Sequence, residues 1–221
     1  MNPRRLLLLG LASGAGLLSC ADIAGPSRNI AYEWRVILST PAGPDTVSFH
    51  WPQSRLPVRV WAADTLNLPA HVQHGIDQWE AAFLYGEFKA VVVSDSNVAD
   101  VIVTSGIAPK GGLSVTRLES LMAPECQGAT DIELTADGQQ ILAPIRVYVD
   151  PRFDPSSPAV DSCMALTTTH ELGHSLGIFL HSLDPNDIMY SDPVVPVLSA
   201  RDRATAELAY HTEATLTITP R

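Results

Sequence analysis

Basic residues are scarce in this chain of 221 residues. Lysine and arginine together number 14, against 24 aspartates and glutamates, so the formal net charge is −10. Removal of a leader that contains Arg4 and Arg5 would leave 12 basic residues and a net charge of −12. No cluster of Lys or Arg remains after that removal, so binding to nucleic acid or to an anionic membrane surface has no electrostatic basis.

Long apolar runs are missing too. The run from Leu6 to Leu18 is too short and too rich in glycine for a good membrane-spanning helix. Arg4 and Arg5 precede it and small residues interrupt and follow it, which is typical of a secretory signal that is removed on export. A buried N-terminal helix is the weaker interpretation of the same residues.

The end of this leader, Leu17-Leu18-Ser19-Cys20, resembles a bacterial lipobox, in which the cysteine is lipidated and becomes the new N-terminus. We therefore expect residues 1–19 to be a lipoprotein-type signal peptide and Cys20 to carry the lipid. The protein would then be an extracytoplasmic lipoprotein of the cell envelope, attached to the membrane only through Cys20. Secretion after cleavage at another small residue is the alternative.

Cysteine is rare as well, and only Cys126 and Cys163 follow Cys20. In an exported protein an isolated pair is most simply a disulfide. Closing a loop of about 37 residues would stabilise the fold by roughly 3–4 kcal/mol in the chain-entropy model. The alternative is that Cys163 is a catalytic thiol beside a histidine.

The remaining composition is that of an ordinary globular protein, with 46% hydrophobic and 17% charged residues. There is no internal repeat and no low-complexity tract. The length suits one domain with an appendage. We expect residues 20–50 to be a tether with at most one hairpin, residues 51–215 to form the domain, and residues 216–221 to be a tail.

Short apolar runs bounded by turn residues predict the strands. We expect strands at 56–61, 89–94, 99–104 and 145–149, an edge strand near 113–116, and a hairpin over 130–145. The polar residues beyond His211 should fray. Together with the helices, this order is consistent with a twisted sheet backed by a helix.

Three helices are predicted from apolar spacing and from end signals. The first opens at Leu68-Pro69, and His71 and His74, which flank its apolar stripe, should lie on the surface. The second runs from about residue 162 to 176. The third starts after Ser199, with Asp202 in a capping-box position.

Three of the seven histidines fall within the second helix and the loop after it. Residues four apart on a helix lie almost one above the other, so His170 and His174 project from one face. Two imidazoles at that spacing can bind one tetrahedral zinc ion. Glu171 lies about a quarter turn away, too offset to be a ligand but close enough to reach a metal-bound water.

Gly177 predicts the end of this helix, because glycine adopts the left-handed conformation at little cost. The reversal would bring His181 back to the metal from the following loop. Three neutral histidines leave a fourth position for water, which is the arrangement of catalytic rather than structural zinc sites.

These residues resemble the metzincin zinc endopeptidases, and the matrixin branch in particular. The family pattern is His-Glu-x-x-His-x-x-Gly-x-x-His followed by a methionine turn, and His170, Glu171, His174 and Gly177 match it. Ser182 looks like the residue that marks matrixins. The segments 184–186 (Asp-Pro-Asn) and 188–190 (Ile-Met-Tyr) are similar to the matrixin chain through the methionine turn.

The resemblance implies an α+β fold of the metzincin-like catalytic domain. Such a domain has a twisted mixed β-sheet with a backing helix and an active-site helix, then a small C-terminal subdomain with the methionine turn and a final helix. It further implies that Met189 forms an apolar floor under the histidines.

The chain departs from the family pattern at the third histidine. The family places it three residues after the glycine, where this chain has Leu180, and His181 comes one residue late. A single-residue bulge can absorb this difference, so we assign His181 as the third ligand.

Two further departures concern elements that many matrixins have. No histidine lies between His74 and His170, so a second, structural zinc is not expected. The candidate ligands of a structural calcium are Asp95, Asp100, Asp131, Asp150 and Asp154, although no calcium-loop spacing appears. No pro-segment cysteine is available to block the metal, because Cys20 is used in export.

The resemblance implies a monomeric zinc endopeptidase with one catalytic ion, which hydrolyses extracytoplasmic proteins or peptides with Glu171 as general base and acid. Three alternatives remain open. A gluzincin-type enzyme would need a glutamate as third ligand, for which Glu207 is the candidate. An inactive zinc-binding lipoprotein that serves as a binding module is the second alternative, and a purely structural helix is the third.

Overall fold

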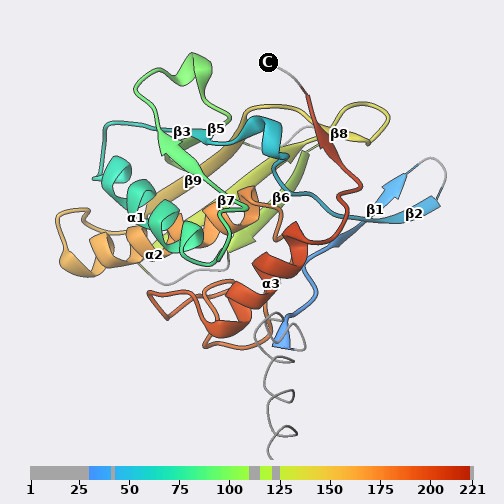
Figure 1. Cartoon of the computed structure of the whole chain (residues 1–221). Helices are drawn as coiled ribbons and strands as arrows, with labels where there is room; N and C mark the ends of the chain where they lie inside the picture. The colour runs from blue at the N-terminus through green and yellow to red at the C-terminus, as the bar shows by residue number, and fades with distance from the viewer. Residues whose placement is uncertain (1–29, 41–42, 110–114, 121–124, 220–221) are drawn as a thin grey trace, which may run out of the picture.

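The computed structural model describes residues 30–40, 43–109, 115–120 and 125–219. These residues form an α+β fold with one six-stranded mixed sheet, two short two-stranded sheets and three α-helices (Figure 1). The α+β class predicted from the sequence is therefore confirmed. The predicted signal peptide and the lipidation site at Cys20 lie outside the described residues.

The six-stranded sheet has the order β4-β3-β5-β9-β7-β6. The first four strands in this order are parallel to one another, whereas β7 runs antiparallel to both β9 and β6. In chain order the strands are β3 (Val58–Ala62), β4 (Ala90–Val92), β5 (Val101–Ser105), β6 (Val115–Ser120), β7 (Cys126–Glu133) and β9 (Ile145–Pro151).

One face of the sheet is buried under two helices. In the central strands alternate valines are buried, and Val60 and Val101 line one small apolar cavity together with Ile76 and Leu172 of the helices. Successive side chains of a strand point to opposite faces, so this alternation gives the sheet one apolar face. Figure 1 shows α1 and α2 on that side, with α3 below α2 in the view.

The predicted hairpin over 130–145 is present only in a shorter form, because β7 uses both of its edges for β6 and β9. Around the Gly138 turn, Leu134 forms an antiparallel bridge to Ile141, and the Leu142 N–H donates to Glu133 O at 2.8 Å. Strand β8 (Gln140–Ile141) also pairs in parallel with β10 (Thr217–Ile218). The prediction that the chain frays beyond His211 is therefore wrong for residues 212–219, where Leu216 is buried and β10 is paired.

The segment before the domain contains the one expected hairpin, formed by β1 (Val36–Thr40) and β2 (Gly43–Val47). Large side chains on either side of this hairpin, Trp34, Phe49 and Trp51, are buried in the core. Within residues 20–50, Trp34 and Phe49 are thus packed into the domain.

The helices are α1 (Leu68–Glu80), α2 (Pro158–Ser175) and α3 (Ala200–Tyr210). The helix start at Leu68-Pro69 and the capping box of Ser199 with Asp202 are confirmed. Helix α2 begins four residues earlier than expected, with Pro158 in its first turn, where the missing N–H is not needed.

The prediction that His71 lies on the surface is wrong, whereas His74 is exposed as expected. His71 is buried between α1 and α2, and its Nε2 lies 3.2 Å from the Asp161 carboxylate. The two helices come close because Gly75 of α1 has no side chain; a Cβ there would lie 2.7 Å from Leu172 Cδ1.

The predicted disulfide between Cys126 and Cys163 is present, with 6.0 Å between the two Cα atoms. It ties the start of β7 to α2. Cys163 is consequently not available as a catalytic thiol.

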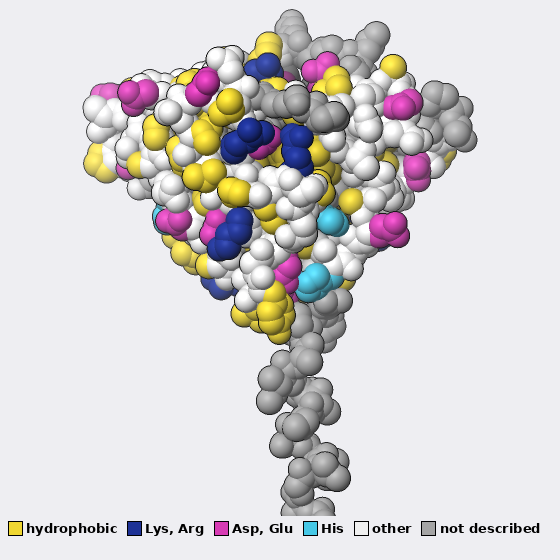
Figure 2. Space-filling view, turned by 45° about the horizontal axis from the view of Figure 1, so that its top comes forward, with side chains coloured by type: hydrophobic (Ala, Val, Ile, Leu, Met, Phe, Trp, Pro, Cys, Tyr) yellow, Lys and Arg dark blue, Asp and Glu magenta, His cyan; other side chains and the backbone are white. Residues whose placement is uncertain are grey.

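The surface carries few basic side chains, in agreement with the acidic composition. On the face shown in Figure 2, Lys and Arg side chains are few and lie among acidic and apolar ones. Within the described part of the chain, no helix is long and apolar enough to cross a membrane.

Candidate metal centre

Helix α2 is enclosed on all sides where it carries the motif. Every residue from 167 to 175 is buried. Two tryptophans bind its backbone: Trp79 Nε1 donates to Thr169 O at 2.8 Å, and Trp51 Nε1 donates to Ser175 O at 3.0 Å. This packing explains how a run of three threonines, with low helix propensity, is held in a helix.

Two adjacent faces of α2 make contact with different parts of the protein. Cys163, Thr167 and Glu171 are spaced four apart and face β7, where Cys163 forms the disulfide. His170 and His174 lie on the neighbouring face and point toward the loops after the helix. The quarter-turn offset predicted for Glu171 thus separates it from the two histidines.

Met189 lies directly against the helix between the two histidines. A Cβ on Gly173 would overlap Met189 Sδ and lie 2.6 Å from Trp79 Cζ2, so this position must be glycine. Met189 is fully buried, as an apolar floor requires. The sequence reasoning missed Gly173, although a glycine inside a helix is costly and usually has a packing reason.

The chain reverses after α2 as Gly177 predicted. Gly177 has φ = +108°, and a Cβ there would overlap the carbonyl oxygen of Phe49. The Ile178 N–H donates to Gly173 O and the Gly177 N–H donates to His174 O, at 3.2 and 3.0 Å. These two bonds form a Schellman motif.

A bulge follows the reversal and accommodates the late histidine. The N–H groups of both Phe179 and Leu180 donate to Trp34 O, at 2.8 and 3.2 Å. Two successive N–H groups on one acceptor give a bulge-like turn, here outside any β-strand, and such a turn takes up one extra residue. Leu180 is exposed at the surface, and His181 points back to the helix.

The structure brings His170, His174 and His181 together, as the sequence predicted. One ligand nitrogen from each lies within 4.8 Å of the others. The His174 and His181 Nε2 atoms are 3.1 Å apart. Among the described residues, this is the one group of three or more His, Cys, Asp or Glu side chains whose ligand atoms converge.

Backbone carbonyls set the tautomers of the two helical histidines. His170 Nδ1 lies 2.7 Å from Ile188 O, and His174 Nδ1 lies 2.6 Å from Ile178 O. A carbonyl only accepts, so each Nδ1 carries the proton and each Nε2 presents a lone pair to the centre. His170 Nε2 is buried without a hydrogen-bond partner. Such a lone pair fits a metal ion, and three imidazoles suit zinc.

Burial keeps these imidazoles neutral, which is the form that binds metal. It lowers the pKa of His170 to about 3, with a smaller contribution from His181. The pKa of His174 falls well below its ordinary value, first through burial and then through the two neighbouring histidines. Burial also lowers the pKa of the half-buried His181.

Glu171 is not part of the converging group. Its carboxylate is fully buried between α2 and β7, where Thr130 Oγ1 donates to Glu171 Oε2 at 2.7 Å. The space exists because Gly128 on β7 has no side chain; a Cβ there would overlap the carboxylate. Sequence reasoning identified Glu171 but not these two partners, which are about 40 residues away on another element.

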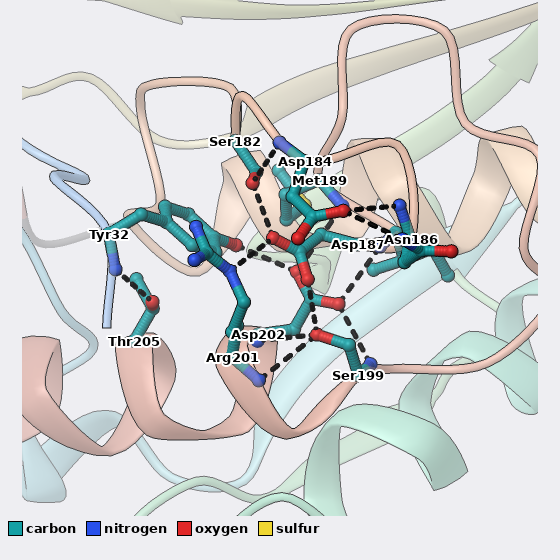
Figure 3. A network of polar contacts seen from close by, with 11 residues as sticks. Tyr32, Ser182, Asp184, Asn186, Asp187, Met189, Ser199, Arg201, Asp202 and Thr205 are labelled. Carbon is teal, nitrogen blue, oxygen red and sulfur yellow. Dashed lines mark hydrogen bonds and ion pairs between the residues drawn. The ribbon is translucent and has the colours of Figure 1, made fainter. Parts of the chain in front are cut away.

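Two buried aspartates support the methionine turn from below (Figure 3). Asp202 accepts the N–H groups of Ile188 and Met189, at 2.9 and 3.4 Å. Asp187 accepts the Ser182 hydroxyl, and Arg201 Nε at 2.9 Å. Burial raises the pKa of Asp202, and the nearby charge of Asp187 acts in the same direction. The sequence identified Asp202 only as a helix cap.

The other candidate ligands do not gather. Asp100 binds the guanidinium groups of Arg55 and Arg59, while Asp95 and Asp154 accept from backbone N–H groups of their own turns. The described part of the chain therefore has no acidic cluster of the kind considered for calcium. Glu207, the gluzincin alternative, is not in the triad either.

Comparison with known proteins adds no identification, since no protein-family model matches the chain and no curated protein is significantly similar to it. The functional assignment rests on the residues themselves.

The depressed pKa of His170 predicts a pH dependence of the metal-free protein. An unfolded histidine takes up a proton near pH 6.5, but native His170 does so only near pH 3. The free energy of unfolding should therefore be highest above pH 6.5 and fall as the pH is lowered toward 3. Urea unfolding in the presence of a chelator, at a series of pH values from 7.5 to about 5, measures this slope.

His170→Gln should flatten that slope, because one of the buried groups no longer gains a proton on unfolding. The matched control is His74→Gln, at an exposed position of α1, which should keep the wild-type slope. An unfolding free energy that stays constant or rises as the pH falls would contradict the prediction.

Proposed function

We propose that this protein is a zinc-dependent endopeptidase of the metzincin type, similar to matrixins, which hydrolyses peptide bonds of extracytoplasmic proteins or peptides. The observation that carries the proposal is the convergence of His170, His174 and His181, with the tautomers of the first two fixed and the Nε2 of His170 buried without a partner. The buried Met189 under the helix and the Gly177 reversal support the same family.

His170, His174 and His181 would hold the zinc ion. When bound, zinc supplies Lewis-acid chemistry, in that it polarises a carbonyl and lowers the pKa of water to about 7. Glu171 takes the proton of the attacking water and passes it to the leaving amine, a role typically worth about 10²–10⁴-fold in rate. Thr130 Oγ1 donates to the Glu171 carboxylate and holds it against β7.

A zinc-binding lipoprotein without catalysis is the second candidate. The late third histidine no longer favours it, since the bulge brings His181 into the triad. The observation that does favour it is the enclosure of Glu171, whose carboxylate has no exposed surface. In either case we propose a monomer outside the cytoplasm, attached to the membrane through a lipid on Cys20 or secreted.

The zinc content of the purified protein tests the ligand assignment. We expect about one zinc per chain in the wild type, as for three-histidine sites, and a sharp fall in His181→Ala. Leu180→Ala is the matched control, because it removes the neighbouring side chain at the position where the family has its histidine. Full zinc in His181→Ala together with loss in Leu180→Ala would overturn the assignment.

Cleavage of a peptide library tests the catalytic role. Glu171→Gln keeps the shape of the side chain and should keep the zinc, but it should lower kcat by about 10²–10⁴-fold because the proton acceptor is lost. The control Glu213→Gln, at an exposed position, should cleave like the wild type. If the wild type binds zinc but cleaves no peptide, the binding-module function replaces the peptidase.

A further inference from the structure

The segment Tyr32–Trp34, here named the N-terminal strap, lies between two parts of the candidate metal centre. In the sequence, Trp34 precedes Phe179 in the loop of His181 by 145 residues, and Tyr32 precedes Asp202 on α3 by 170 residues. Its backbone nevertheless binds the loop before His181, and Tyr32 binds α3 (Figure 3 shows the contacts of Tyr32).

The strap holds the bulge that precedes the third histidine. Trp34 O is the single acceptor for the N–H groups of Phe179 and Leu180, and the next residue is His181. The Trp34 side chain is itself buried, which fixes the position of this carbonyl. The extra residue gives the loop two additional backbone torsions, and these two hydrogen bonds restrict them.

The strap is also bound to α3. The Tyr32 N–H donates to Thr205 Oγ1 at 3.0 Å, and the Tyr32 hydroxyl donates to Asp202 Oδ1 at 2.8 Å. The Arg201 guanidinium lies 5.8 Å from the centre of the Tyr32 ring, on its face. Figure 3 shows these groups together beneath the methionine turn.

From Asp202 the chain of hydrogen bonds continues to the first histidine. Asp202 Oδ2 accepts the Ile188 N–H at 2.9 Å, and Ile188 O is the acceptor for His170 Nδ1 at 2.7 Å. Three consecutive hydrogen bonds therefore connect the Tyr32 hydroxyl to the ring of His170. Groups that bind the second nitrogen of a ligating histidine fix its orientation, and their partners hold them in turn.

We propose that the N-terminal strap positions the metal ligands, with Tyr32 and Asp202 as positioning residues for His170 and the Trp34 carbonyl as the positioning group for His181. This inference rests on the proposed metal site. The strap lies outside the metal-binding motif. It would nevertheless affect metal affinity, because it fixes the positions of the first and third ligands relative to each other.

The test compares full-length wild type with Tyr32→Phe, Asp202→Asn and the double variant. The matched control is Tyr85→Phe, which removes the same hydroxyl from a side chain that is 82% exposed. Zinc affinity is measured by competition with a chromophoric chelator, under conditions in which each variant is folded. The visible spectrum of bound Co²⁺ reports the geometry of the ligands.

Asp202→Asn should weaken zinc binding by about 10–100-fold, the usual cost of losing a group that orients a ligand. Tyr32→Phe should weaken it less, by about tenfold or below, because it acts one hydrogen bond further away. The double variant should match Asp202→Asn, since the hydroxyl acts through that carboxylate. Both single variants should shift the Co²⁺ bands, and Tyr85→Phe should not.

A merely structural strap would give a different result: the variants would unfold at lower urea concentrations but bind zinc with wild-type affinity and an unchanged Co²⁺ spectrum. That outcome would overturn the inference and leave the metal site standing. A wild type that binds neither Zn²⁺ nor Co²⁺ would refute the proposed function and the strap inference together. If Asp202→Asn does not fold, the inference is decided by the zinc affinity and the Co²⁺ spectrum of Tyr32→Phe, compared with those of Tyr85→Phe.

Discussion

A hydrogen bond from Nδ1 to a backbone carbonyl, made once by His170 and once by His174, is the interaction on which the centre depends. Each bond places the proton on the outer nitrogen and leaves the Nε2 lone pair toward the centre. Because both rings are fully buried, they stay neutral, and neutral imidazole is the ligand form. Without the two carbonyls, the same histidines would be buried polar groups without a defined orientation.

The two carbonyls come from chain reversals that the packing around α2 makes possible. Ile178 O follows the left-handed Gly177, which fits only because glycine leaves room for the Phe49 carbonyl. Ile188 O belongs to the turn that Asp202 holds from below. Gly173 lets Met189 approach the helix between the two histidines. The burial of the site and the orientation of its histidines thus have the same cause, which is the close packing that Gly173 and Gly177 permit.

Features that depend on neighbouring residues were predictable from the sequence. The spacing of His170 and His174, the helix end at Gly177 and the capping box of Ser199 and Asp202 each lie within one or two helical turns. Features that depend on distant partners were not. The burial of His71 needs Asp161 from another helix, and the second role of Asp202 needs Tyr32, which is 170 residues away. Strand β10 likewise needs β8 as its partner, so a polar tail was expected in its place.

Glu171 follows the candidate ligand His170 in the sequence, but its carboxylate is enclosed on another face of α2. Its offset from the ligand face follows from helix geometry alone, but its enclosure by Gly128 and Thr130 depends on how β7 packs against α2. The disulfide between Cys126 and Cys163 ties these two elements together close to that contact. The same three histidines are therefore compatible with a peptidase or with a binding module. Whether water reaches the Glu171 carboxylate decides between these two functions.

We propose that three imidazoles, from the end of α2 and the following loop, hold one zinc ion. X-ray absorption at the zinc K-edge of protein loaded with one equivalent of zinc measures the number and type of its ligands. We expect a four-coordinate site with three imidazole nitrogens at about 2.0–2.1 Å and one further light atom. A first shell with sulfur near 2.3 Å, or with fewer than three imidazoles, would contradict it.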